Sequence, residues 1–179
     1  MRILMQNNTV QKHNGKKFLH QRLKRFVYTS FVKTMAKETG TGLKVNSFTR
    51  VTPKTTIGEH SNFNGMTIQG KGNVSIGRYF HSGQECLIIT DAHNYEGEEI
   101  PYDDTDIVKD VTIDDFVWIG TRVTILGGVH IGEGAIIQAG AVVVSDIPAC
   151  AIAGGNPAKV FKYRDQEHFY SKKAQEKFH

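Results

Sequence analysis

The chain has 179 residues, of which 39% are hydrophobic and 22% are charged, and its formal net charge is +4. This length fits one domain, and the basic residues gather at the two ends without a nucleic-acid-binding motif, so we expect no nucleic-acid partner. The two cysteines, Cys86 and Cys150, are far apart and lack metal-ligand spacing, which argues against a disulfide or zinc framework and fits a cytoplasmic protein. No apolar run is long enough for a signal peptide or a membrane span.

Residues 16–37 predict a basic amphipathic helix. Its apolar residues recur at helical spacing and are Phe18, Leu19, Leu23, Phe26, Val27, Phe31, Met35 and Ala36. Seven lysines and arginines supply the polar side, and Gly40 and Gly42 predict the helix stop. Two interpretations stay open. The helix either caps the open end of the repeat described below, or it contacts an anionic membrane surface, which would place the protein peripherally at the inner membrane.

A six-residue repeat occupies the second half of the chain. Six aliphatic residues stand at intervals of six, namely Ile113, Ile119, Ile125, Ile131, Ile137 and Val143. Weaker repeats precede them at residues 55–57, 61–63, 66–68, 74–76 and 80–82, with the insert QGKGN breaking the phase after Ile68. A period of six fits neither an α-helix nor a hairpin ladder, and it predicts a hexapeptide parallel β-helix.

The repeat also predicts which side chains point inward and outward. Each hexad holds an in-out-in triplet, because side chains alternate across a strand. Three hexads form one coil, so residues eighteen apart stack. We therefore expect Trp118 beside Ile136, and Thr124 beside Val142, with all four side chains pointing outward. An outward tryptophan beside an outward isoleucine forms an apolar patch, typical of an interface or a ligand groove.

The repeat stops over residues 83–110, which we expect to form an extruded loop. Such an insertion in a compact fold is typically functional or disordered, and this one carries Asp91 and His93 in the run ITDAHNY. A neutral histidine beside a carboxylate can act as a general base, with the acid fixing its tautomer. A loop that docks on another subunit and carries a surface histidine is the alternative.

Three runs, ITDAHNY, VWIGTRVTILGGVHIGEGAIIQAGAVVVSDIP and AIAGGNPAKVFK, resemble the hexapeptide-repeat acyltransferases. The similarity covers residues 54–162 and is greatest to the branch of galactoside, maltose, other sugar and xenobiotic acetyltransferases. It implies a homotrimer of left-handed β-helices, with acetyl-CoA bound as co-substrate between neighbouring solenoids. The fold class expected is therefore all-β, a left-handed parallel β-helix with an N-terminal amphipathic helix, an extruded loop and a short C-terminal helical tail.

The same resemblance implies roles for individual residues. His93 is the catalytic base, which deprotonates an acceptor hydroxyl for direct attack on the thioester. Trp118 lines the cleft near the acceptor or the acetyl group, and Asn64 and Asp91 lie on the acceptor side. The residues implied at the cofactor, besides Trp118, are Ala139 and Gly140 along the pantetheine arm, Ser145 where some relatives contact the cofactor, and Lys159 and Lys162 near the 3′-phosphate.

Together these features predict three regions: a helical cap at 1–45, a β-helix domain at 46–160 and a tail at 161–179. The function expected is acetyl transfer to a saccharide hydroxyl in the biosynthesis of a surface polysaccharide or lipopolysaccharide. One alternative is N-acetylation of a nucleotide-linked amino sugar, and another is a purely structural or interaction solenoid. The related zinc enzymes need closely spaced histidines, which His81, His93 and His130 do not provide, so we expect no metal.

Overall fold

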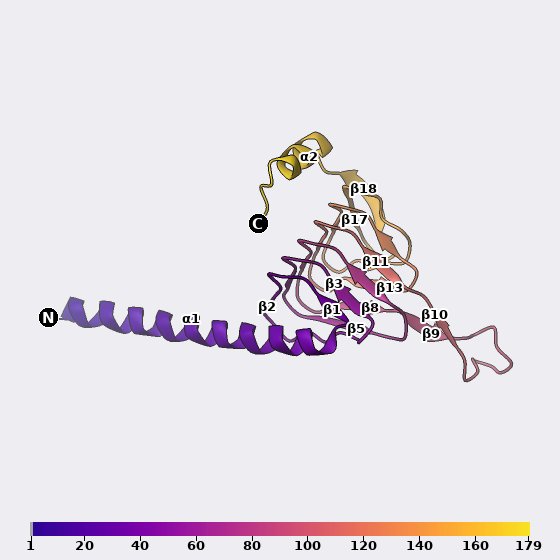
Figure 1. Ribbon diagram of the computed structural model, residues 1–179, viewed down its shortest axis with the longest axis horizontal. Helices are drawn as coiled ribbons and strands as arrows, with labels where there is room; N and C mark the ends of the chain where they lie inside the picture. The colour runs from indigo at the N-terminus through magenta and orange to yellow at the C-terminus, as the bar shows by residue number, and fades with distance from the viewer. Residues whose placement is uncertain (1) are drawn as a thin grey trace.

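The computed structural model describes the backbone of residues 2–179 and the side chains of residues 19–179. The main body is a parallel β-helix of about six coils, with three sheets along its sides (Figure 1). The first sheet contains β1 (Glu38–Thr39), β3 (Thr55–Ile57), β6 (Val74–Ile76), β11 (Val111–Ile113) and β14 (His130–Ile131). The second contains β2 (Lys44–Val45), β4 (Asn62–Phe63), β7 (His81–Ser82), β12 (Trp118–Ile119), β15 (Ile136–Ile137), β17 (Ala151–Gly154) and β18 (Lys159–Tyr163). The third contains β5 (Met66–Gln69), β8 (Cys86–Ile89), β13 (Thr124–Leu126) and β16 (Val142–Val143).

The predicted register is confirmed. Trp118 pairs with Ile136 and Thr124 pairs with Val142, in parallel strands of adjacent coils. All six aliphatic residues of the repeat are almost fully buried in one continuous core. Burial of this aliphatic column is the main force that stabilises the stack.

Helix α1 (Arg2–Met35) begins before the predicted start at Lys16 and ends two residues before the predicted end at Lys37. The chain then enters the first sheet as β1, which pairs with β3. The proposed boundary between a cap at 1–45 and a solenoid from residue 46 is therefore wrong, because β1 and β2 already belong to the solenoid. Sequence reasoning missed this because two-residue strands carry too little alternation to be recognised.

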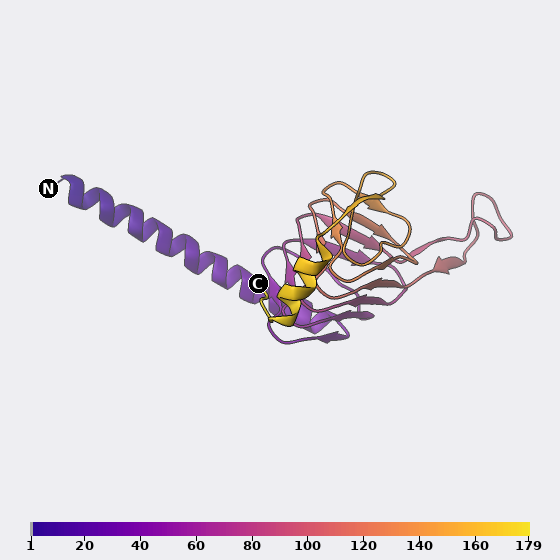
Figure 2. The ribbon, with the colours of Figure 1, turned by 90° about the horizontal axis from the view of Figure 1, so that it is seen from above.

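Only the last turns of α1 cover the open end of the solenoid. Val32 is fully buried in the solenoid core, and Tyr28, Met35 and Ala36 pack against it. The preceding turns project away from the body (Figures 1 and 2). The end of the helix therefore packs over this end of the solenoid, whereas the side chains of Leu19, Leu23, Phe26 and Val27 are exposed.

The predicted loop at 83–110 is also corrected. Cys86 and Ile88 point inward from β8, a regular strand that pairs with both β5 and β13. The interruption therefore begins after Ile89. It forms an antiparallel hairpin of β9 (Asp91–His93) and β10 (Asp106–Val108), which leaves the solenoid between the third and first sheets.

The C-terminal end is closed by a second hairpin and a helix. β18 folds back antiparallel on β17, so the predicted tail at 161–179 begins inside a strand. α2 (Gln166–Ala174) starts at Asp165, whose side chain accepts a hydrogen bond from the backbone N–H of His168. This is a standard N-cap. Within residues 2–179, neither helix is long and apolar enough to cross a membrane.

Candidate functional site

His93 lies on the extruded hairpin, directly opposite Asp106 in the pairing of β9 with β10. Its Nδ1 atom is 3.8 Å from Asp106 Oδ1, and the imidazole stacks on the ring of Tyr102 with a centroid distance of 4.0 Å. The His93 side chain is 62% exposed. Nδ1 thus lies near a carboxylate, and the ring stacks on Tyr102, so an exposed histidine and a neighbouring acid are brought together as candidates for a general base.

The carboxylate that faces His93 is Asp106, and not Asp91 as the sequence suggested. Asp91 instead accepts a hydrogen bond from the backbone N–H of Lys71, at 3.1 Å. The Lys71 ammonium pairs with Asp106, and the hydrogen bond and charge of Asp106 raise the pKa of Lys71. The insert that breaks the early repeat, which includes Lys71, therefore supports the base of the hairpin.

Asp103 fixes the tip of the same hairpin. Its carboxylate accepts hydrogen bonds from the backbone N–H of Glu98 at 3.0 Å and from the backbone and hydroxyl of Thr105. These bonds lower the pKa of Asp103. At the foot of the hairpin, a small cavity of about 180 Å³ is lined mainly by apolar side chains, among them Tyr95 and Ile107.

A second group of predicted residues gathers on the outer face of the second sheet. Trp118 is 52% exposed and lies between His81 and Ile136 in the strand register. His81 is half-buried, and its Nε2 is 3.2 Å from Asn64 Nδ2. Burial, together with the charge of His179, lowers the pKa of His81. His81 is therefore neutral at neutral pH and can take part in hydrogen bonding beside Trp118.

Asn64 is the centre of a polar network that extends to α1. Its amide donates to the Ser82 carbonyl at 2.7 Å, and its Oδ1 accepts from Asn46 at 2.9 Å. Asn46 in turn accepts from Arg25 Nε at 2.7 Å. Asn64 also lines an open groove of about 470 Å³ at the corner between the second and third sheets. The structure thus places Asn64 on the same side of the solenoid as Trp118.

Four of the predicted cofactor residues lie along this sheet and its edge. Ala139 and Gly140 form the corner between the second and third sheets, and nothing lies within 4 Å of a Cβ built on Gly140. Lys162 pairs with Ile152 in the ladder that continues from Ile136, and Lys159 lies further along the same strand. An open corner that leads to two exposed cations fits an extended ligand with phosphates at one end.

Ser145 does not join this group. It follows β16 at the far end of the third sheet, away from the corner formed by Ala139 and Gly140. The three histidines considered for a metal are also separated: His81 lies on the second sheet, His130 on the first and His93 on the hairpin. Among residues 19–179, no three His, Cys, Asp or Glu side chains gather as metal ligands.

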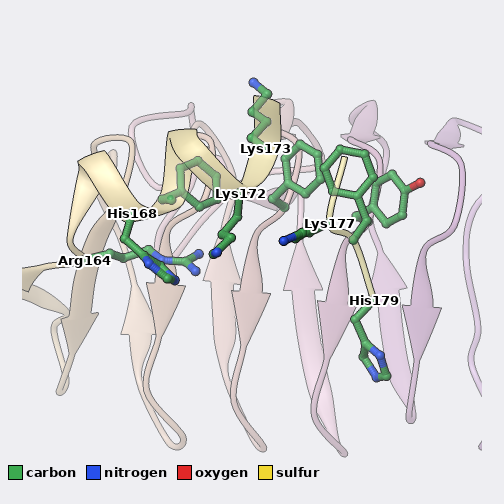
Figure 3. Close-up of a pocket in the computed structure, with 10 residues that line it drawn as sticks. Arg164, His168, Lys172, Lys173, Lys177 and His179 are labelled. Carbon is green, nitrogen blue, oxygen red and sulfur yellow. The ribbon is translucent and has the colours of Figure 1, made fainter. Parts of the chain in front are cut away.

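A further pocket of about 300 Å³ lies beneath α2 and was not predicted from the sequence (Figure 3). The rings of Tyr79, Phe116 and Phe178 pack against one another on one side of it. Lys172 and Lys177 point into the pocket, whereas Lys173 points away in Figure 3 and pairs with Glu133. This pocket lies at the corner between the first and second sheets.

His93 and Trp118 do not meet within one chain. The hairpin that carries His93 leaves the corner between the third and first sheets, and Trp118 lies on the second sheet, which is the side opposite that corner. Each chain therefore presents a histidine on one side and an apolar, open-cornered face on another.

One stretch of the repeat matches a known family profile. Residues 110–145 match the profile described as bacterial transferase hexapeptide (six repeats). This part of the chain is a hexapeptide repeat. Its β-helix is the fold of the hexapeptide-repeat acetyltransferases. One of these, from Vibrio cholerae O1 biovar eltor in complex with acetyl coenzyme A, is 25% identical with a TM-score of 0.66, and the match covers 75% of each chain.

Two other similar proteins carry more specific names. A maltose O-acetyltransferase from Clostridium difficile 630 is 26% identical with a TM-score of 0.57, over 72% of this chain and 66% of that one. A 2,3,4,5-tetrahydropyridine-2,6-dicarboxylate N-acetyltransferase from Staphylococcus aureus (strain JH9) is 54% identical over 52 residues. That match spans 29% of this chain and only 22% of the staphylococcal enzyme.

Proposed function

We propose that the protein transfers the acetyl group of acetyl-CoA to a hydroxyl group of a saccharide, in the synthesis of a surface polysaccharide or lipopolysaccharide. The observation that carries the proposal is the position of His93, on an extruded hairpin with Asp106 facing its Nδ1. The similarity to the acetyltransferase from Vibrio cholerae supports acetyl-CoA as the donor. The similarity to the maltose enzyme supports a sugar acceptor.

In this mechanism, His93 removes the proton from the acceptor hydroxyl through Nε2. Asp106 keeps the remaining ring proton on Nδ1 and stabilises the imidazolium that forms. The acceptor oxygen then bonds to the acetyl carbonyl carbon, and the carbon–sulfur bond breaks. His93 returns its proton to the departing sulfur, so that CoA leaves as the thiol. No covalent enzyme intermediate forms.

The donor would lie along the corner at Ala139 and Gly140. Trp118 and Ile136 supply an apolar surface for the pantetheine end, and Lys159 and Lys162 supply positive charge for the phosphates. Asn64 and the neutral His81 would bind the acceptor's hydroxyl groups, since both can donate or accept hydrogen bonds.

This arrangement requires more than one copy of the chain. Because His93 and Trp118 lie on opposite sides of one solenoid, the complete site is formed when the hairpin of one copy faces the second sheet of another. A homotrimer with three such grooves is the assembly that we propose.

An amine acceptor is the second candidate, and the identity to the staphylococcal N-acetyltransferase over 52 residues favours it. That match spans only 22% of the staphylococcal enzyme. The same base would serve an amine by removing a proton from the ammonium form or from the tetrahedral adduct.

The test is CoA release from acetyl-CoA in the presence of a panel of oligosaccharides, nucleotide sugars and their amino analogues. Turnover with hydroxyl acceptors, and with none of the amines, supports O-acetylation. Turnover with the amines alone supports the second candidate. A ligand at 100 times its Kd should stabilise the folded protein by about 2.7 kcal/mol. If no acceptor supports turnover and acetyl-CoA does not raise the melting temperature, the acetyl-transfer proposal fails.

A further inference from the structure

Two parts of the chain project from the solenoid in opposite directions and carry opposite charges (Figures 1 and 2). Helix α1 contains eight lysines and arginines and no acidic residue. The hairpin tip, residues 94–106, contains six aspartates and glutamates and no lysine or arginine. Segments with this charge bias attract each other, and each repels a second copy of itself.

The acidic tip keeps most of its charge available. Asp103 and Asp106 are used within the hairpin and its base. The other four acids make no ion pair with the described side chains, and they are Glu96, Glu98, Glu99 and Asp104. All four are exposed, so the tip presents a compact negative surface.

Each projection also exposes apolar side chains. On α1, Leu19, Leu23 and Phe26 are 60–70% exposed. At about 100° of rotation per residue, these three lie on the side of the helix opposite Val32, which is buried in the solenoid. On the hairpin, Ile100 is 96% exposed. Apolar groups at the centre of charged surfaces are typical of protein interfaces.

The two surfaces cannot meet within one chain, because α1 and the hairpin extend to opposite sides of the body (Figure 1). We propose that the hairpin tip of one copy docks on the outward face of α1 of a second copy. Each copy then uses its own hairpin on one neighbour and its own α1 on the other, and a contact of this kind forms a closed ring when the rotation between copies closes.

An anionic membrane is the competing occupant of α1, since a basic helix with an apolar stripe also fits a lipid surface. A membrane would leave the acidic hairpin without a partner. A second copy satisfies both surfaces at once, and the observations therefore favour it.

The interface itself does not depend on the proposed function. On each copy, α1 is connected to the second sheet, because Arg25 hydrogen-bonds to Asn46 and Asn46 to Asn64. If both proposals hold, a hairpin that docks on α1 therefore also brings His93 toward the second sheet of that neighbour. The contact would then set the geometry of the shared groove.

The test is charge reversal with rescue, read as the molar mass of the full-length protein by light scattering across a dilution series. Glu98→Lys with Glu99→Lys, and separately Arg22→Glu with Lys33→Glu, should each weaken the assembly at least ~10-fold. Combining all four changes should restore it. Glu167→Lys with Glu176→Lys on the C-terminal tail makes the same charge change as the hairpin reversal and should leave the mass unaltered.

Several results would overturn the proposal: a monomeric wild type, reversals that leave the mass unchanged, or a combination that fails to recover it. If a charge-reversal variant fails to fold, Ile100→Ser is measured in its place. The Ile100 side chain is almost fully exposed, so its loss should weaken the assembly and not the fold. Co-sedimentation with phosphatidylcholine–phosphatidylglycerol vesicles tests the alternative that α1 binds a membrane. If Arg22→Glu with Lys33→Glu releases the protein from vesicles and does not change its mass, the membrane is the occupant and the proposal is wrong.

Discussion

Comparing the activity of variants at Asp106 and at Asp91 is the most direct test of the geometry around His93. Asp106 Oδ1 lies 3.8 Å from His93 Nδ1, whereas Asp91 binds the backbone of Lys71. Two unit charges at this distance attract by about 1 kcal/mol in a water-like medium, and His93 is largely exposed. Removing the charge of Asp106 should therefore cost about 1 kcal/mol of transition-state stabilisation, or about fivefold in kcat/KM.

The assay is CoA release under kcat/KM conditions for the wild type, Asp106→Asn, Asp91→Asn and His93→Ala. We expect a loss of about fivefold for Asp106→Asn, a loss of about 10²–10⁴ for His93→Ala, and less than about a twofold change for Asp91→Asn. Asp91→Asn is the matched control, because it makes the same chemical change two residues from His93. A larger loss for Asp91→Asn than for Asp106→Asn would refute the reasoning.

Three further outcomes follow from the solenoid and its outer face. Ile119→Ala should lower the free energy of unfolding in denaturant by about 2–5 kcal/mol, because this side chain is fully buried. Ile136→Ala on the outer face should lower it by less than about 1 kcal/mol. Equal losses would contradict the inward–outward assignment. The pKa of His81 is lowered from 6.5 in the folded state, so the unfolded chain takes up the proton more readily. The free energy of unfolding should therefore fall as the pH drops below 6.5. His81→Gln should reduce this dependence of the free energy of unfolding on pH. Lys162→Ala and Lys159→Ala should raise the KM for acetyl-CoA and leave that for acetyl-3′-dephospho-CoA nearly unchanged; an equal rise for both donors would remove these lysines from the 3′-phosphate.

The parts of the fold that the sequence predicted well are those in which one physical rule acts on every coil. The inward aliphatic positions must stack to bury their surface, so the pairing of Trp118 with Ile136 followed from the period alone. The same rule failed at β8, where Cys86 takes an inward position that is aliphatic in the later coils. The sequence therefore predicts β8 as part of the loop.

The site was less predictable, because its contacts depend on where distant segments meet. Asp106 was missed since its position opposite His93 depends on the pairing of β9 with β10, thirteen residues away along the chain. A match between the two arms of the loop could have indicated a hairpin, but the arms are only three residues long. Val32 was missed because the apolar residues of α1 occupy two opposite sides of the helix, and only one side reaches the core.

Subunit mixing tests most directly whether the reaction site is shared between copies. His93→Ala removes the base, and Trp118→Glu places a charge on the exposed face where the donor would lie. Each variant alone should be inactive. When equal amounts are unfolded together and reassembled, about a quarter of the grooves in a ring should pair an intact hairpin with an intact second sheet, so about a quarter of the wild-type activity should return. A mixture as inactive as its two components would show that His93 and Trp118 do not act across a boundary between copies.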